Sequence, residues 1–382
     1  MEPRNIRVST SDFGNLRRDG AVYVDKTALV YALAHEDRAF FLSRPRRFGK
    51  SLLVSVLEAY FEGRRDLFDG LAVSELETDW VRHPVLKFDL SLAHYTSASD
   101  LSAALATMLA SYESLYGRAG DDSDNPGLRL HNLIRRAVQK TGEQVVVLID
   151  EYDAPLLDAM RTPAYEPLRD MLQGFYKVLK ESTAYLRFVF LTGITKFSQV
   201  NIFSALNHLT NITMIPKYAS ICGITSEEIV SQLMPEVESM AASERLSVES
   251  LLSALKRRYD GYHFMANCPD IYNPFSLLNC LKYKRLDNYW YSTGTPTLLT
   301  KEIAHFAIDP AKLEGFWASE MDFNVPIETA ETPIAVLYQS GYVTIKAFNG
   351  YDYLLGFPNE EVRVSFIKGL APHYTKKDIV ES

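Results

Sequence analysis

The sequence is poor in cysteine and has no long apolar run. Its three cysteines are scattered and include no Cys-x-x-Cys pair, which argues against both a disulfide framework and a zinc site. No apolar run approaches the roughly 20 residues that span a membrane. Residues 1–11 also lack the apolar core of a signal peptide. These absences predict a soluble protein of the reducing cytoplasm, with no membrane partner.

The chain also lacks net positive charge. Its formal net charge is −8 at pH 7, which argues against a general nucleic-acid binder, although a local basic face stays possible. With 382 residues, 47% of them hydrophobic, the chain can bury a large core. This length predicts two or more domains.

The rest of the chain is organised around residues 39–58. A short apolar run at 40–42 predicts a buried strand, and a basic turn follows it. Gly49-Lys50-Ser51 then opens a segment whose apolar residues have helical spacing. Strand, turn and helix start in this order are the context of a phosphate-binding loop, because a helix N-terminus presents unpaired N–H groups and a positive dipole end. The predicted nucleotide-binding residues of this stretch are Arg46, Arg47, Phe48, Gly49, Lys50, Ser51 and Leu52.

Two of these residues have distinct expected roles. The Lys50 ammonium is expected to face solvent and to bridge the terminal phosphates of ATP, while the Ser51 hydroxyl ligates Mg²⁺. The motif has one defect, because Arg44 stands where the full pattern has glycine. A residue with a Cβ must tolerate the local backbone there or reshape the loop. Gly-Lys-Ser alone is also typical of a capped surface helix, so a second motif has to support it.

The second motif lies at residues 144–151. Five consecutive apolar residues end in Asp150 and Glu151, a pattern that predicts a buried parallel strand delivering two carboxylates at its C-terminal end. Asp150 is expected to hold Mg²⁺ with its water shell, and Glu151 to polarise the attacking water as general base. A buried strand ending in two acids also arises by chance. Its position after the Gly-Lys-Ser motif favours the catalytic interpretation.

Three further candidates flank these motifs. Lys26 precedes a predicted helix that Asp25 or Thr27 could cap; the residue either lies near the nucleotide or serves only the helix start, and both interpretations stay open. Thr192 lies among the last residues of a predicted strand at 186–195, and Lys196 follows that strand. They are candidate catalytic residues that sense the γ-phosphate from a neighbouring strand, and the alternative is an ordinary strand-to-loop transition.

The remaining pattern predicts an α/β P-loop NTPase of the additional-strand, catalytic-glutamate type. Further predicted elements are a strand at 85–91, two helices within 100–140, a short helix and loop at 201–211 and a last strand at 219–225. The helical pattern after residue 225 predicts a lid. His263 has no cysteine or histidine at ligand spacing and is expected to be structural.

The C-terminal part predicts a winged-helix-like module. Thr295 and Pro296 are expected to open one helix, a second is expected at 332–340, and Asn349-Gly350 is the strongest short signal of a β-hairpin. A closing helix follows Pro358. Because no convincing basic face is present, packing is favoured over DNA recognition. The predicted domains are the P-loop domain at 1–225, the helical lid at 226–288 and the winged-helix-like domain at 289–382.

The chain resembles the bacterial AAA-ATPase-like family, whose members usually carry a PD-(D/E)XK nuclease-like domain after the ATPase. The motifs that carry this resemblance are Tyr23-Val-Asp-Lys-Thr27, Ser43-Arg-Pro-Arg-Arg-Phe-Gly-Lys-Ser-Leu52, Leu148-Ile-Asp-Glu-Tyr-Asp-Ala-Pro155, Leu191-Thr-Gly-Ile-Thr-Lys-Phe-Ser198, Asp260-Gly-Tyr-His-Phe264, Tyr289-Trp-Tyr-Ser-Thr-Gly-Thr-Pro-Thr297 and Leu355-Gly-Phe-Pro-Asn-Glu-Glu-Val-Arg363. They follow one another over nearly the entire chain. The resemblance implies that Arg44 is the family's own usage.

The resemblance also implies a nuclease-like domain after the closing helix. From Lys301 onward the sequence contains no Asp-x-Lys or Glu-x-Lys tripeptide, which is the lysine-bearing half of the nuclease motif. We therefore expect either a truncated or split family member, or a separate nuclease-like or other effector protein as partner. The chain alone is expected to cut no nucleic acid.

The predicted function is ATP binding with slow Mg²⁺-dependent hydrolysis, used as a conformational switch. The main alternative is a non-hydrolysing module that binds protein or nucleic acid on the same scaffold, and Arg44 favours that alternative. A small-molecule kinase is a third interpretation. It is weakened by Glu151 directly after Asp150, since that pairing suits the activation of water.

Overall fold

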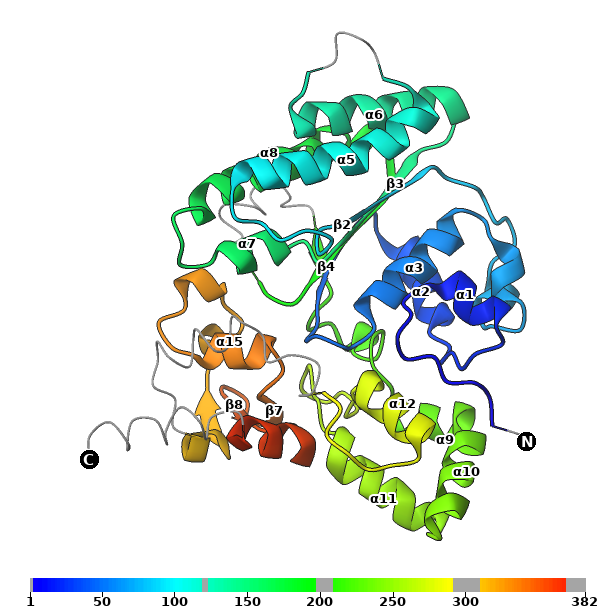
Figure 1. Ribbon diagram of the computed structural model, residues 1–382, viewed down its shortest axis with the longest axis vertical. Coiled ribbons are helices and arrows are strands. Elements are labelled where there is room, and N and C mark those ends of the chain that lie inside the picture. The colour runs from blue at the N-terminus through cyan, green and yellow to red at the C-terminus, as the bar shows by residue number, and fades with distance from the viewer. Residues whose placement is uncertain (1–2, 119–122, 197–208, 291–309, 369–382) are drawn as a thin grey trace.

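A parallel five-stranded sheet forms the centre of the molecule (Figure 1). The computed structural model describes residues 3–118, 123–196, 209–290 and 310–368. The strands are β1 (Ala39–Ser43), β2 (Val85–Asp89), β3 (Val145–Asp150), β4 (Leu186–Gly193) and β5 (Thr210–Asn211), in the order β2-β3-β4-β1-β5. The strand that precedes the phosphate loop, β1, pairs with β4 and not with β3. The predicted additional strand between the two motifs is therefore present.

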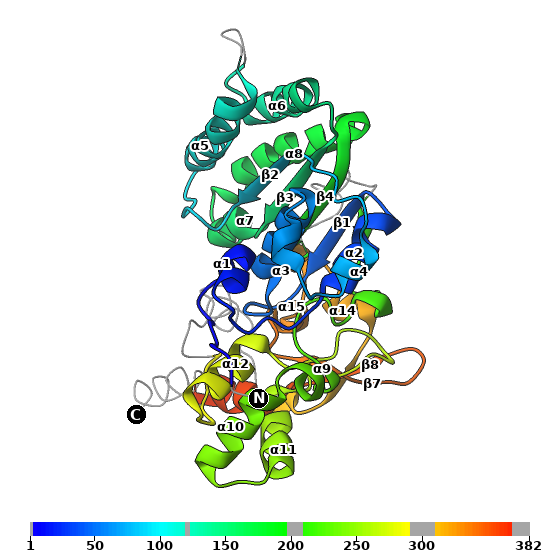
Figure 2. The same ribbon diagram turned by 90° about the vertical axis from the view of Figure 1, so that its right-hand side faces the viewer.

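Helices cover both faces of this sheet (Figure 2). On one face lie α1 (Phe13–Arg18), α2 (Thr27–Glu36) and α3 (Lys50–Phe61); on the other lie α5 (Ala98–Tyr116), α6 (Pro126–Thr141), α7 (Ala154–Ala159) and α8 (Tyr165–Glu181). All six residues of β3 are buried, as expected for a central strand of a parallel sheet. The apolar run at 145–149 therefore encodes a strand that is buried on both faces of the sheet.

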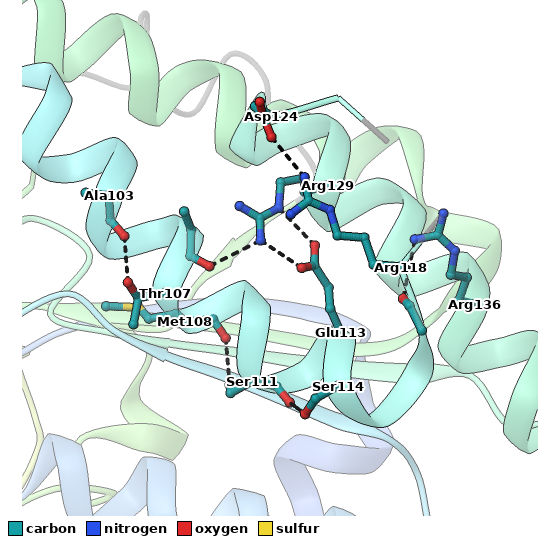
Figure 3. Close-up of polar contacts among 12 residues, drawn as sticks. Ala103, Thr107, Met108, Ser111, Glu113, Ser114, Arg118, Asp124, Arg129 and Arg136 are labelled. Atoms are coloured by element: carbon teal, nitrogen blue, oxygen red, sulfur yellow. Dashed lines mark hydrogen bonds and ion pairs between the residues drawn. The ribbon is translucent and has the colours of Figure 1, made fainter. Parts of the chain in front are cut away.

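A buried ion pair joins the two predicted helices α5 and α6 (Figure 3). Arg129 Nε and Nη2 lie 2.9 and 2.7 Å from the two carboxylate oxygens of Glu113, and the two side chains are only 5% and 6% exposed. Bidentate pairing of this kind fixes both distance and orientation. Asn125 caps α6 by accepting hydrogen bonds from the backbone N–H groups of Gly127 and Leu128. The helical hairpin is thus held as a rigid layer on the sheet.

The predicted last strand at 219–225 is wrong. Residues 219–225 form no ladder; only Ile224 makes an isolated bridge, to Tyr272. The edge strand is instead β5, within the stretch expected to be helix and loop, of which residues 197–208 lie outside the described residues. Gly223 has a φ of +93°, and a Cβ there would lie 2.1 Å from Ile271 Cγ2. The apolar residues are buried against the phosphate loop, and a short apolar run does not distinguish this arrangement from a strand.

Four helices follow residues 219–225 in the region predicted to be a lid. They are α9 (Ser226–Gln232), α10 (Met234–Glu244), α11 (Val248–Tyr259) and α12 (Pro274–Tyr283). They share their own apolar core, which also takes in Ile6 and Val22 of the N-terminal segment. Thr225 and Glu228 form a reciprocal capping box at the start of α9. His263 Nδ1 lies 3.1 Å from Asp270 Oδ1, so the histidine is hydrogen-bonded.

The C-terminal module, defined here as residues 310–368, contains the expected helix and hairpin. They are α15 (Ile334–Gln339), β7 (Thr344–Phe348) and β8 (Tyr353–Gly356), followed by a helix at 360–368. A third strand, β6 (Phe316–Ala318), pairs with β8, and α14 (Glu320–Phe323) follows it. The helix expected at Thr295 and Pro296 lies outside the described residues. The limits of the three predicted domains stay predictions.

Among the described residues, none of the helices is both long and apolar enough to cross a membrane.

Candidate functional site

The loop between β1 and α3 places Lys50 beneath its own backbone. Gly49 caps α3 with a φ of 89°, a conformation that glycine adopts without steric cost. Lys50 Nζ donates to the carbonyl oxygens of Arg44 (3.2 Å) and Pro45 (3.4 Å) and lies 3.4 Å from Glu151 Oε1. The residue is 4% exposed. The expectation of a solvent-facing ammonium is therefore wrong, because the loop curls over the side chain and supplies acceptors for it.

Arg44 points away from this loop. It is 1% exposed, and Nη1 donates to the carbonyl oxygens of Ser43 (3.0 Å) and Thr213 (2.8 Å). Nη2 donates to the Tyr218 carbonyl at 3.3 Å, and the guanidinium lies 4.1 Å from the centroid of the Phe264 ring. Arg44 is absent from the residues with positive φ. The backbone thus tolerates an arginine, whose side chain ties the loop to the segment after β5.

The acids at the end of β3 meet this loop. Asp150 is 4% exposed, and burial raises the pKa of its carboxyl to about 6, while a hydrogen bond from the Ser51 hydroxyl acts in the opposite direction. Glu151 has a φ of 49°, and its side chain is 21% exposed beside Lys50. The two motifs found in the sequence therefore converge at the carboxyl ends of β1 and β3.

A third acid, Asp153, was not identified from the sequence. It is fully buried, and its Oδ2 accepts hydrogen bonds from Ile194 N (3.0 Å), Thr195 N (2.7 Å) and Thr195 Oγ1 (2.7 Å). Its Oδ1 has no hydrogen-bond partner within the described part of the chain. A Cβ on Gly193 would lie 2.3 Å from that oxygen, so the approach requires glycine. The run Asp150-Glu151-Tyr-Asp153 was the available signal.

A cavity of about 590 Å³ opens beside these residues, a size typical of small-molecule sites. All seven predicted loop residues from Arg46 to Leu52 line it, as do Lys26 and Glu151. Its apolar wall comes from the N-terminal segment and the lid, with Val8, Val24, Ile224, Pro274 and Leu278. Phe48 lines the cavity with a side chain that is 1% exposed and packs edge-on against Tyr262.

Two basic residues of the cavity wall also contact the lid. Lys26 Nζ lies 2.5 and 2.6 Å from the two carboxylate oxygens of Glu228. Burial lowers the pKa of Lys26, and Glu228 opposes that change. The Arg47 guanidinium lies 4.3 Å from the centroid of the Phe275 ring on α12, a cation–π distance. Lys26 lines the cavity and also precedes the first residue of α2, where Asp25 Oδ1 accepts from Thr27 N at 2.8 Å. Both interpretations of Lys26 therefore stay open.

The two candidate sensors lie elsewhere. Neither Thr192 nor Lys196 belongs to the lining of the cavity that the described residues form. Thr192 is fully buried, and Lys196 contacts the C-terminal module, with Nζ 2.9 Å from Asn324 Oδ1. Ile194, between them, does line the cavity. The sequence pattern thus placed both residues correctly at the end of β4. It did not predict the direction in which their side chains point.

The strand order, the loop between β1 and α3 and the acids at the end of β3 define a P-loop nucleoside-triphosphatase fold. The sequence profile described as "Predicted AAA-ATPase" matches residues 7–203. The chain belongs to this family of predicted AAA-ATPases. The resemblance inferred from the motifs is confirmed, and the family implies nucleotide binding.

Two similar proteins accompany this match. An "Uncharacterized protein in vnfD 5'region" of Azotobacter chroococcum mcd 1 is 34% identical over 384 residues, which covers 98% of this chain and 71% of that protein. The solved structure of the Aeropyrum pernix ORC1 protein in complex with DNA covers 92% of this chain and 91% of its own, with 13% identity and a TM-score of 0.29. That score is too low to assign a shared fold.

Proposed function

We propose that this protein binds ATP in the cavity beside Lys50 and hydrolyses it slowly with Mg²⁺, so that the nucleotide state acts as a conformational switch. The observation that carries the proposal is the meeting of two motifs from distant parts of the chain. Lys50 of the loop lies 3.4 Å from Glu151 of the strand end, and Ser51 is near enough to Asp150 to lower the pKa of its carboxyl. Lys50, Ser51 and Glu151 line the same cavity.

The Lys50 ammonium is expected to exchange its present contacts for contacts with the triphosphate of ATP. The ammonium is held by two neutral carbonyl oxygens and by Glu151, and a polyphosphate offers stronger, charged acceptors. The N-terminus of α3, a helix of 12 residues, adds free N–H groups and a positive dipole end. The apolar wall of the cavity is suited to the adenine ring of ATP.

The Ser51 and Asp150 side chains fit Mg²⁺. They supply a hydroxyl and a carboxylate oxygen, the hard donors that this ion prefers. A buried carboxylate whose pKa is raised to about 6 is destabilised in its charged form, and a nearby cation relieves that cost. When bound, Mg²⁺ neutralises charge on the β- and γ-phosphates.

Glu151 is the proposed general base. Its carboxylate borders the cavity and is partly exposed, so it can accept a proton from a water molecule. One of its carboxylate oxygens lies 3.4 Å from the Lys50 ammonium. Transfer of Lys50 to the phosphates therefore frees the base, which couples nucleotide binding to activation.

A calorimetric titration with ATP, with and without Mg²⁺, followed by a phosphate-release assay, tests the proposal. We expect binding that tightens with Mg²⁺ and a slow release of phosphate. Absence of binding would contradict the assignment of the cavity. Binding without release would favour the alternative, a non-hydrolysing module that binds protein or nucleic acid.

A further inference from the structure

The turn that carries Glu151 is clamped to the end of β4. Tyr152 N donates to the Thr192 carbonyl at 3.0 Å, and Tyr152 Oη donates to the Thr195 carbonyl at 3.0 Å. Asp153 Oδ2 accepts from Ile194 N and from both the N–H and the hydroxyl of Thr195. Glu151 lies between these contacts and β3 with a φ of 49°. Residues with a Cβ adopt this left-handed conformation less readily than glycine does, so the contacts on either side help to hold it.

The far side of the same segment is held by the C-terminal module. Gln339 Oε1 accepts from Lys196 N at 2.7 Å, and Asn324 Oδ1 accepts from Lys196 Nζ at 2.9 Å. Ile327 N donates to the Lys196 carbonyl at 3.2 Å. Residues 194–196 thus have the Glu151 turn on one side and the C-terminal module on the other.

Gln339 is well placed to make this contact rigid. It is 6% exposed, and its Nε2 donates to the carbonyl oxygens of Phe323 (3.1 Å) and Val325 (2.7 Å). Both ends of the amide are therefore hydrogen-bonded: Nε2 donates inside the module, and Oε1 accepts from Lys196 N. A buried amide is costly to leave unpaired. We therefore expect the hydrogen bonds of the Gln339 amide to form together and to break together.

We propose that Asp153 is a positioning residue for Glu151, and that docking of the C-terminal module on Lys196 controls how firmly Asp153 holds it. Undocking removes the acceptor of the Lys196 N–H and frees the backbone next to Thr195. The hydrogen bonds to Asp153 then break more often, and Glu151 leaves its imposed conformation. The effect on turnover rests on the proposed function; the physical coupling between module and turn does not.

A clamp made only for stability would not need an acid at this position. A neutral oxygen acceptor could receive the same bonds without burying a charge. Asp153 instead keeps a carboxylate beside Glu151, with one oxygen lacking a partner among the described residues.

Hydrogen exchange of the intact chain tests the coupling without nucleotide. Peptides covering residues 148–156 and 188–196 are followed by mass spectrometry in the parent, in Gln339→Ala and in Asn324→Ala. Lys346→Ala is the matched control, because Lys346 Nζ donates to the Gly261 carbonyl at 3.4 Å and so also links the module to the rest of the molecule, away from Lys196. We expect about five-fold faster exchange at 148–156 in Gln339→Ala, as for the loss of one hydrogen bond, and parent-like exchange in Lys346→Ala.

Two results overturn the coupling: parent-like exchange at 148–156 in both Gln339→Ala and Asn324→Ala, or an equal increase in the Lys346→Ala control. If Gln339→Ala does not fold, Asn324→Ala decides alone, since it removes the acceptor of Lys196 Nζ and leaves Gln339 in place. Failure of ATP to bind would contradict the proposed function. It would not affect the conclusion about coupling, because the hydrogen-exchange experiment is carried out without nucleotide.

Steady-state kinetics test the positioning role. Asp153→Ala is expected to lower kcat about ten-fold or more with ATP affinity unchanged by calorimetry. Asp153→Asn keeps an oxygen acceptor for Ile194 and Thr195 and is expected to recover most of the rate. A parent-like kcat in Asp153→Ala, or a loss of ATP affinity that accounts for the whole effect, would overturn it.

Discussion

The two loops that face each other across the site are held in different ways. The phosphate loop, residues 44–51, is shaped largely by its own residues: Gly49 has a φ of 89° and Arg47 a φ of 69°, and Lys50 bonds to the loop carbonyls. The acidic turn, residues 150–153, depends on β4, more than 30 residues further along the chain. Local contacts dominate in the first loop, apart from the tie of Arg44 to Thr213 and Tyr218, and tertiary contacts shape the second.

This difference separates binding from chemistry. Donors for a polyphosphate sit on the locally determined loop, whereas the proposed base sits on the turn that distant residues position. The 3.4 Å contact between Lys50 and Glu151 joins the two loops directly. Each variant below changes one loop and leaves the other in place.

The largest expected effect comes from Glu151→Gln. The amide keeps the shape of the side chain and cannot take a proton, so turnover should fall by about 10²–10⁴-fold while ATP still binds. Phosphate release and calorimetry on the same preparation measure both quantities. Hydrolysis at the parent rate would show that Glu151 is not the base.

Lys50→Ala should act on affinity instead. Loss of a charge-assisted contact to the phosphates is expected to weaken ATP binding by about 100-fold, or about 2.7 kcal/mol. Circular dichroism should report a retained fold. Lys177→Ala is the control, since Lys177 is exposed on α8 with Glu181 as its ion-pair partner. Equal ATP affinity in Lys50→Ala and the control would refute the loop assignment.

Arg44→Gly restores the full glycine pattern and should nevertheless harm the protein. Its guanidinium serves the buried carbonyl oxygens of Thr213 and Tyr218, and an unsatisfied buried acceptor costs about 1–3 kcal/mol. Urea unfolding should show a loss of about 3 kcal/mol, against almost none for the exposed Arg46→Gly. Tighter ATP binding with unchanged stability would mean that Arg44 only obstructs the loop.

The smallest effect is expected from Asp150→Asn, and it is a gain in stability. Burial raises the folded-state pKa of Asp150 from 3.8 to about 6, so its stabilising contribution is complete below pH 4 and is lost as pH rises towards 6. The amide removes this loss. Without ligands the variant should be about 1–2 kcal/mol more stable at pH 7, with a flatter stability profile between pH 4 and 6, and its ATP binding should lose its Mg²⁺ dependence. An unchanged unfolding midpoint at pH 7 would show that the carboxylate is not strained.

Sequence patterns determined the elements whose cause is local. The apolar run before Asp150 predicts a strand because its residues are buried on both sides, and Asn349-Gly350 predicts a hairpin because these residues adopt its turn conformation readily. The P-loop itself belongs to this group, since strand, glycine turn and helix start are adjacent in the chain.

Tertiary structure alone decided where long or buried side chains point. Arg44 was ambiguous in the sequence because its partners, Thr213 and Tyr218, lie far along the chain. Lys196 follows a strand end as a sensor should, yet Asn324 and Gln339 provide its acceptors. Residues 219–225 are apolar enough for a strand, and packing on the phosphate loop makes them a loop. Periodicity and turn chemistry act between near neighbours, whereas the partner of a buried polar group is whichever acceptor the fold brings within about 3 Å.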